Sequence, residues 1–272
     1  MECEFITKKG TQCTRKAVIG ECCTQHSTKT VVKEIKETIT ITFAECAENH
    51  AGMQEIGQLA EEGFTILELK KAKKKFQKVG KECEFVDLDN DAGILIVRDF
   101  ADETKELFKE LKGLDWDKKA LMRGKVVNKN ARHNLCFADF DQDPDYPEGK
   151  GRVIDFADLP FLSEVREQLP KFLGEKADNL LAEGNYYYDL SKTYINFHGD
   201  VERRIVIAVR LGETMPLYFQ WYQRGEKVGE MVELCLNDGD LYIMSEKATG
   251  NDWKKRNVLT LRHSAGNLAL MK

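Results

Sequence analysis

Two residues of the kind that bind metal ions lie close together in the second half of the chain. His198 and Asp200 flank Gly199, in a sequence that has only five histidines. In an extended segment, residues two apart project to the same side, so this imidazole and this carboxylate would point together. Such a pair is two-thirds of the 2-His-1-carboxylate arrangement that holds non-haem Fe(II). His263, 65 residues further on, is the candidate third ligand, and the set predicts oxygen chemistry.

The elements that must position these residues are predicted to be strands. Residues 203–211 (RRIVIAVRL) are rich in β-branched side chains, as is typical of a buried strand. Further candidates follow at 215–222, 230–236 and 240–245, with polar turns between them. Helical spacing is found in residues 101–114 and 161–173. Several short strands at close spacing favour a barrel or jelly roll over residues 95–272, and the helices make the fold class α+β.

The segment before this core is predicted to contain two further units. Residues 39–44 (ITITFA) alternate as a strand does, and residues 50–62 and 64–79 carry apolar side chains at helical spacing. The run KKAKKK lies on the outer face of the second of these helices. We therefore expect a small α/β unit over residues 28–94, preceded by a cysteine-rich unit over residues 1–27.

The cysteine-rich unit has the composition of a structural zinc site. Four of the eight cysteines fall within the first 23 residues, and a histidine follows closely. Three thiolates and one imidazole complete a tetrahedral Zn(II) site, whose binding would supply the folding energy of so short a unit. Either of two adjacent cysteines, Cys22 or Cys23, could take part, and Cys23 forms the commoner short closure. The expected ligands are Cys3, Cys13, Cys23 and His26.

The overall charge and the cysteine pattern limit the cell compartment and the partners. The net charge is −5 and the pI about 5.7, so nucleic acid would have to bind through a local basic patch. One such patch surrounds the cysteines, where a phosphate contact and docking of a protein partner are both open. No membrane span and no secretory signal is expected, which favours a reducing, intracellular location in the cytoplasm or nucleus, and a viral origin is open.

From residue 95 onward, the chain resembles the AlkB-like Fe(II)/2-oxoglutarate-dependent dioxygenases. The matching residues are Asn185-x-Tyr187, then His198-x-Asp200, then the strand that ends in Arg210-Leu211-Gly212. The resemblance implies a double-stranded β-helix in which Asn185 and Tyr187 hydrogen-bond 2-oxoglutarate. It also implies that O2 and 2-oxoglutarate are converted to succinate and CO2 while a C–H bond is hydroxylated. When that carbon is an N-methyl group, formaldehyde is released.

The end of the chain departs from the pattern of this family, and two alignments remain open. AlkB-like chains carry an arginine-rich strand for the 2-oxo acid after the distal histidine. In the first alignment, which we favour, His263 is that histidine and Lys272 pairs with the distal carboxylate of 2-oxoglutarate. In the second, Lys255 occupies the ligand position, and Arg256 and Arg262 bind the 2-oxo acid. A protonated lysine cannot bind Fe(II), so the second alignment predicts an incomplete iron site.

The resemblance implies an alkylated or methylated nucleobase, in DNA or RNA, as the substrate. An alternative with the same iron site is hydroxylation of protein side chains, and an alternative of another class is a zinc-dependent binding module with a vestigial oxygenase core. Arg203 or Arg204 could brace a ligand carboxylate. The aromatic side chains that could stack on a flipped base are Tyr186, Tyr188, Phe197, Trp221 and Trp253.

Overall fold

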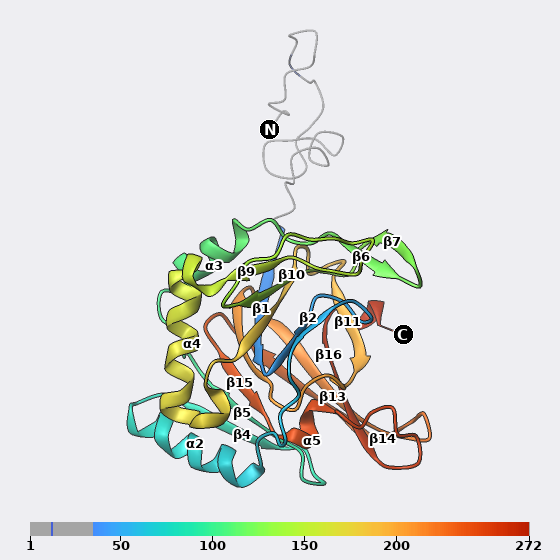
Figure 1. Cartoon of the computed structure of the whole chain (residues 1–272). Helices are drawn as coiled ribbons and strands as arrows, with labels where there is room; N and C mark the ends of the chain where they lie inside the picture. The colour runs from blue at the N-terminus through green and yellow to red at the C-terminus, as the bar shows by residue number, and fades with distance from the viewer. Residues whose placement is uncertain (1–11, 13–34, 272) are drawn as a thin grey trace. The chain divides into compact units, whose positions relative to one another are not determined.

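The computed structural model describes residue 12 and residues 35–271 (Figure 1). The chain divides into two units, Met1–Ile35 and Lys36–Lys272, and nearly all described residues belong to the second. The predicted zinc ligands lie outside the described residues. Among the described residues, no helix has both the length and the apolar character that crossing a membrane requires.

The second unit is a mixed α+β structure made mostly of strands. Its helices are α2 (Ile66–Lys78), α3 (Thr104–Lys112), α4 (Pro160–Leu173) and the short α5 (Glu246–Thr249). Its strands are β1 (Thr38–Ala44), β2 (Cys46–Glu48), β3 (Glu55–Gly57), β4 (Cys83–Asp87), β5 (Gly93–Val97), β6 (Lys119–Met122), β7 (Lys125–Asn128), β8 (His133–Ala138), β9 (Val153–Asp155), β10 (Leu181–Tyr187), β11 (Tyr194–His198), β12 (Ile207–Gly212), β13 (Met215–Gln223), β14 (Glu226–Leu236), β15 (Leu241–Met244) and β16 (Thr260–Gly266).

The large sheet has the strand order β4-β5-β15-β12-β1-β10-β8-β9, with β1 near its centre. β1 pairs antiparallel with β10 on one side and with β12 on the other, so all of its backbone groups can be satisfied. Its side chains alternate between two buried faces. Ile39, Ile41 and Phe43 face the apolar core beneath the helices. Thr40 and Thr42 point to the opposite face, where they line a cavity.

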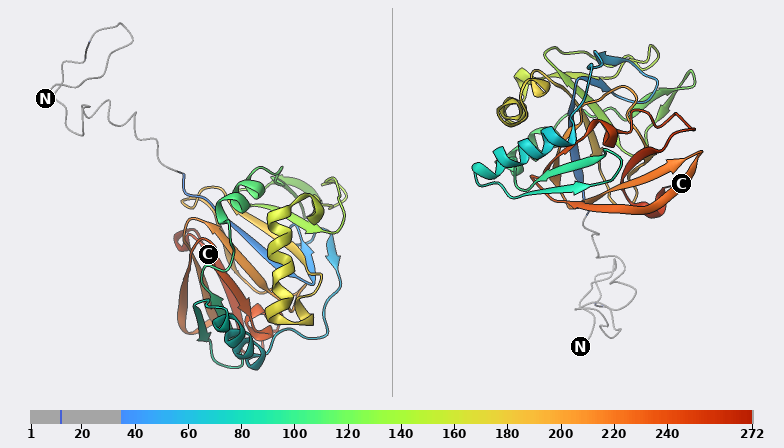
Figure 2. Two further views of the ribbon diagram at one scale, coloured as in Figure 1. Left: turned by 90° about the vertical axis from the view of Figure 1, so that its left-hand side faces the viewer. Right: turned by 90° about the horizontal axis from the view of Figure 1, so that it is seen from below.

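Three helices cover the outer face of the large sheet (Figure 2). Leu69 and Phe76 of α2, with Leu107 of α3 and Leu162 of α4, belong to the same apolar core as the isoleucines of β1. The start of α2 is fixed by a capping box, in which Thr65 and Glu68 satisfy each other's backbone N–H groups. The lysines of α2 are mostly exposed, as expected for the solvated face of an amphipathic helix.

A smaller sheet, with the order β11-β16-β13-β14, lies against the inner face of the large sheet. A second apolar core joins the two sheets, with Ile94 and Met244 from the large sheet and Leu217 and Phe219 from the small one. The expected strands at 203–211, 215–222, 230–236 and 240–245 are confirmed as β12 to β15, with shifts of a few residues at their ends.

Two predictions about the first third of the chain are wrong. Residues 50–62 do not form a helix, and their place is taken by loops and the β2–β3 hairpin. Gly52 and Gly57 adopt φ values of 86° and 95°, which a right-handed helix excludes. The boundary at residue 94 does not separate two units either. β1, β4 and β5 belong to the same sheet as β10, β12 and β15, so strands from both sides of this boundary pair with one another.

Candidate metal centre and its cavity

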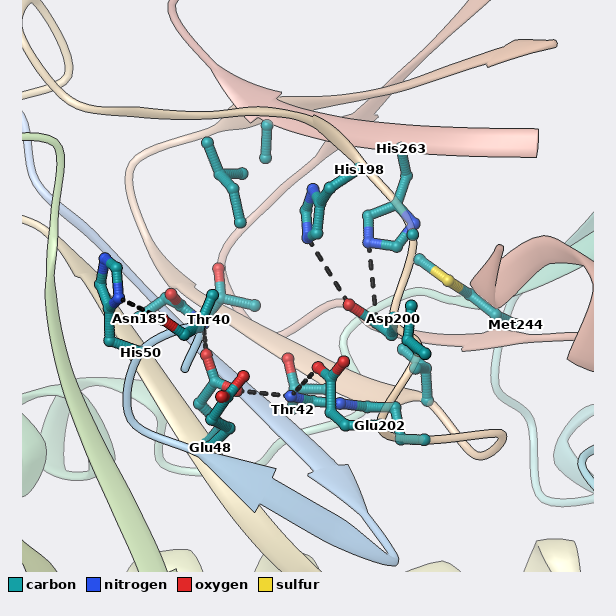
Figure 3. A pocket seen from close by; sticks show the side chains of 18 of the residues that line it. Thr40, Thr42, Glu48, His50, Asn185, His198, Asp200, Glu202, Met244 and His263 are labelled. Carbon is teal, nitrogen blue, oxygen red and sulfur yellow. Dashed lines mark hydrogen bonds and ion pairs between the residues drawn. The ribbon is translucent and has the colours of Figure 1, made fainter. Parts of the chain in front are cut away.

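Two histidines and one aspartate from separate parts of the chain meet between the two sheets (Figure 3). His198 ends β11 and pairs with His263 of β16, and their ring centroids lie 4.4 Å apart. Asp200 Oδ1 is 3.5 Å from His198 Nε2, and Asp200 Oδ2 is 3.7 Å from His263 Nε2. Ligand atoms that share one ion at about 2.1 Å lie roughly 3 Å apart. The three groups are therefore spaced to close on a single divalent ion.

The backbone around the His-x-Asp pair holds both side chains in place. His198 Nδ1 is 2.8 Å from the carbonyl oxygen of Asn196, so Nδ1 can carry the proton and leave Nε2 free for a metal. The backbone N–H of Asp200 donates to the carbonyl of Thr249 at 3.0 Å. Gly199 is required between them, because a Cβ at this position would lie 2.1 Å from the carbonyl oxygen of Gly250.

The electrostatic environment favours a metal ligand at position 263. Burial lowers the pKa of His263 well below its usual range, and the neighbouring His198 and Arg203 lower it further. The imidazole is therefore neutral over a wide range of pH, and a neutral imidazole is the form that binds metals. Two imidazoles and a carboxylate on the wall of a cavity form a donor set that fits non-haem Fe(II) and similar ions.

The cavity beside these residues has a volume of about 490 Å³ and is lined by both sheets. Asn185 and Tyr187 of β10 are among the residues that line it. Asn185 Oδ1 accepts hydrogen bonds from the Arg132 side chain and from Asn134 Nδ2, and its Nδ2 donates to Glu183 Oε1 at 3.1 Å. These bonds fix the orientation of an amide that faces the cavity.

Arg210 of β12 is the feature of this cavity that the sequence-based reasoning missed. Its side chain is fully buried and lines the cavity. Nη1 donates to Thr40 Oγ1 at 2.9 Å, whereas Nε and Nη2 have no hydrogen-bond partner among the described residues. Burial lowers the pKa of Arg210, but a guanidinium keeps its proton at any physiological pH. The one signal in the sequence was a charged residue inside an otherwise apolar strand.

A network of carboxylates surrounds a second buried arginine near the metal ligands. Arg203 Nη2 binds Glu183 at 2.6 Å and Glu202 at 2.9 Å. Burial alone would raise the pKa of Glu183, but the charge of Arg203 holds it below its usual value. Glu48 forms no ion pair with any described residue, and burial, with Glu202 and Glu183 adding to it, raises its pKa to about 7. Arg204 points away from the cavity, toward Glu246.

The arginines of the second alignment do not reach the cavity. Arg256 is exposed in a turn, where its carbonyl oxygen accepts a hydrogen bond from the backbone of Arg224. Arg262 precedes His263 in β16 and therefore projects to the opposite face, where its guanidinium lies 3.9 Å from the ring centre of Tyr222. Lys255 is exposed and lies in the same turn as Arg256, and Lys272 lies outside the described residues.

Arg132 places a positive charge on the cavity wall and forms no ion pair with the described residues. His50 also lines the cavity, but burial lowers the pKa of its imidazole. Lys129 Nζ donates to the side chain of Asn49 at 2.6 Å. Lys129 and Arg132 follow the β6–β7 hairpin in the sequence. Of the five aromatic side chains predicted to stack on a base, only Trp253 lines the cavity. Four cations of the hairpin region, which we name the basic hairpin, are exposed and make no ion pair within the described chain: Lys118, Lys119, Arg123 and Lys125.

The fold and the site together define a strand-rich α+β protein with a His-Asp-His cluster in a cavity between two sheets. No protein-family model matches the chain. The chain is 48% identical over 247 residues to "Uncharacterized protein R156" of Acanthamoeba polyphaga mimivirus, and the alignment covers 86% of this chain and 97% of that protein. The chain therefore belongs to the same family as this mimivirus protein.

Proposed function

We propose that the protein is an Fe(II)- and 2-oxoglutarate-dependent dioxygenase. The observation that carries the proposal is the meeting of His198, Asp200 and His263 on the wall of one cavity. The strand order supports it, because two facing sheets with the metal ligands on the smaller one are what a double-stranded β-helix requires. In this reading β11 and β16 supply the two histidines, and β10 supplies the amide and phenol of Asn185 and Tyr187.

The residues of the chain have distinct roles in this proposal. Bound Fe(II), together with 2-oxoglutarate and O2, supplies the oxidation of an unactivated C–H bond. His198, Asp200 and His263 would hold the ion at the wall of the cavity. Asn185 and Tyr187 orient the 2-oxo acid by hydrogen bonds. Apolar side chains of the lining, such as Val206, Leu217 and Met244, keep water away from the reacting atoms.

A methylated or otherwise alkylated nucleobase is the proposed substrate. The basic hairpin supports this choice, because cations without acidic partners among the described residues bind phosphates at little desolvation cost. Its second strand, β7, is followed within four residues by Arg132, which lines the cavity. Trp253, on the cavity wall, offers a surface on which a base can stack. Zn(II) at the cysteine-rich unit remains part of the proposal, as does an intracellular location. The four described cysteines are free thiols, which supports a reducing compartment.

A second candidate substrate is a basic side chain of a protein. It is favoured by Glu48 and Glu55, two carboxylates of the cavity lining that no described lysine or arginine neutralises. They would attract an ammonium or guanidinium group into the cavity. This candidate shares the metal centre and the cosubstrate with the first. The two candidates differ only in the substrate that enters the cavity.

Succinate release tests the proposal. The protein is incubated with Fe(II), 2-oxoglutarate and O2, and with either methylated oligonucleotides or methylated peptides. We expect succinate and formaldehyde in the oligonucleotide series, and their loss in Asp200→Ala and His263→Ala. His133→Ala is the matched control, because His133 stacks on Tyr188 and does not line the cavity. Turnover only with peptides would select the second candidate, and unchanged metal binding by His263→Ala would refute the metal centre.

A further inference from the structure

The buried guanidinium of Arg210 has fewer hydrogen-bond partners in the described chain than a buried charge normally has. Among the described residues it belongs to the largest fully buried side chain, and it makes one hydrogen bond to them, to Thr40. Buried charges in folded proteins are normally paired or saturated with hydrogen bonds, since removal from water is otherwise unfavourable. Two of the three guanidinium nitrogens, Nε and Nη2, lack any partner in the described chain.

No carboxylate of the described chain neutralises Arg210. Asp240 is close in the structure, since its carbonyl oxygen accepts the backbone N–H of Arg210. Its carboxylate, however, is bound by the Arg98 side chain and by the backbone N–H of Asn237. The other polar groups that face Arg210 are the phenols of Tyr187 and Tyr242, both of which line the cavity. Arg210 therefore carries a positive charge that no described carboxylate neutralises, and its side chain lines the cavity.

Arg210 shares this cavity with the groups that would hold the reacting end of a 2-oxo acid. Asn185, Thr40 and Arg210 are direct cross-strand neighbours on β10, β1 and β12 and form one row across the inner face of the large sheet. Neighbouring strands are about 4.8 Å apart, so this row places Arg210 roughly 10 Å from Asn185 along the sheet. His198, Asp200 and His263 line the same cavity.

We propose that Arg210 binds the distal carboxylate of 2-oxoglutarate, in the place of Arg256, Arg262 or Lys272. This inference rests on the proposed function. A planar guanidinium with two free donors matches a carboxylate in bidentate geometry, and the enclosed setting strengthens the pair. Thr40 and the two phenols complete a polar end to the cavity.

The topology explains why the anchor lies on β12. The position between β10 and β12 is taken by β1, which presents threonine to the cavity. The positive charge that the ligand requires is therefore supplied by the next strand, β12, and Thr40 of β1 orients it.

Binding measurements test the inference without turnover. The full chain is loaded with Mn(II) under anaerobic conditions and titrated calorimetrically with 2-oxoglutarate or with 2-oxopentanoate, which has the same chain length but no distal carboxylate. We expect the protein to prefer 2-oxoglutarate at least about 30-fold, since loss of one partner of a buried charge pair has effects of this size or larger. Arg210→Met should lose this preference, Arg210→Lys should keep part of it, and Arg262→Met should behave as the unaltered protein.

The stability of the unliganded protein provides a second readout. Arg210→Met removes a buried charge that has no partner, so its unfolding temperature without ligand should equal or exceed that of the unaltered protein. Its stabilisation by 2-oxoglutarate should disappear. Undiminished preference for 2-oxoglutarate in Arg210→Met, or its loss in Arg262→Met, would overturn the inference while the proposed function stands. An unaltered protein that binds Mn(II) but neither 2-oxo acid would instead refute the proposed cosubstrate.

Discussion

Glu48→Gln should make the unliganded protein more stable at pH 8 and leave its stability almost unchanged at pH 4. Burial and the nearby Glu202 and Glu183 raise the pKa of Glu48 from its usual 4.5 to about 7. The glutamine has the same shape and can still accept the hydrogen bond that Glu48 Oε1 receives from the backbone of Gly52. The substitution therefore removes the charge and little else.

The sign and size follow from proton linkage. Below pH 4.5 Glu48 is protonated in both the folded and the unfolded chain, so its charge does not affect stability. Between pH 4.5 and 7 only the unfolded chain loses the proton, and the folded protein loses stability as the pH rises. One pKa unit corresponds to about 1.4 kcal/mol, so a rise from 4.5 to about 7 sets an upper bound of about 3.5 kcal/mol. Because Glu48 keeps some contact with solvent, screening reduces the expected gain to about 1–2 kcal/mol.

Urea unfolding of the metal-free protein, followed by circular dichroism at pH 4, 5, 6, 7 and 8, measures this difference directly. The gain of Glu48→Gln over the unaltered protein should rise through this range and level off above pH 7. Glu55→Gln is the matched control, because Glu55 is an exposed cavity-lining carboxylate whose loss should change stability by a few tenths of a kcal/mol at most. A gain for Glu48→Gln that is the same at every pH would refute the reasoning.

Three further predictions concern the metal ligands, the basic hairpin and the amino-terminal unit. Gly199→Ala should destabilise the protein by about 2–4 kcal/mol and abolish Mn(II) binding measured by calorimetry, because the new Cβ would meet the Gly250 carbonyl. Charge reversal of the basic hairpin should weaken oligonucleotide binding in a filter assay and reduce its dependence on salt, whereas reversal of Lys70, Lys71, Lys74 and Lys75 on α2 should not. A chain that lacks residues 1–35 should lose one equivalent of zinc by elemental analysis and keep both the unfolding temperature and the Mn(II) affinity of the remaining unit.

The parts of the fold that the sequence predicts well are those in which local pattern and burial agree. The apolar run at 203–211 and the alternation at 39–44 identify β12 and β1, and helical spacing identifies α2, α3 and α4. Residues 50–62 have the apolar spacing of a helix, but they contain glycines whose backbone angles are set by the β2–β3 hairpin. Apolar spacing does not reveal such angles.

The candidate site was predictable where it depends on neighbours in sequence and unpredictable where it depends on strand order. His198 and Asp200 are two residues apart, so their common direction follows from local geometry. The approach of His263 needed only the assumption that β16 returns to β11. Arg210 could not be recognised as a cavity residue, because its surroundings are set by the insertion of β1 between β10 and β12.

The central position of β1 has a consequence for the synthesis of the protein. Thr40 and its hydrogen-bond partner Arg210 are 170 residues apart in the chain. At about 5–20 residues per second, a ribosome needs roughly 10–30 s to make the partner after the strand itself has emerged. During this interval the sequence TITITFA has neither of its edges covered, and it is short, apolar and rich in β-branched residues. A nascent chain of this kind should need a holding chaperone until β12 is complete, and its yield should fall when such chaperones are depleted.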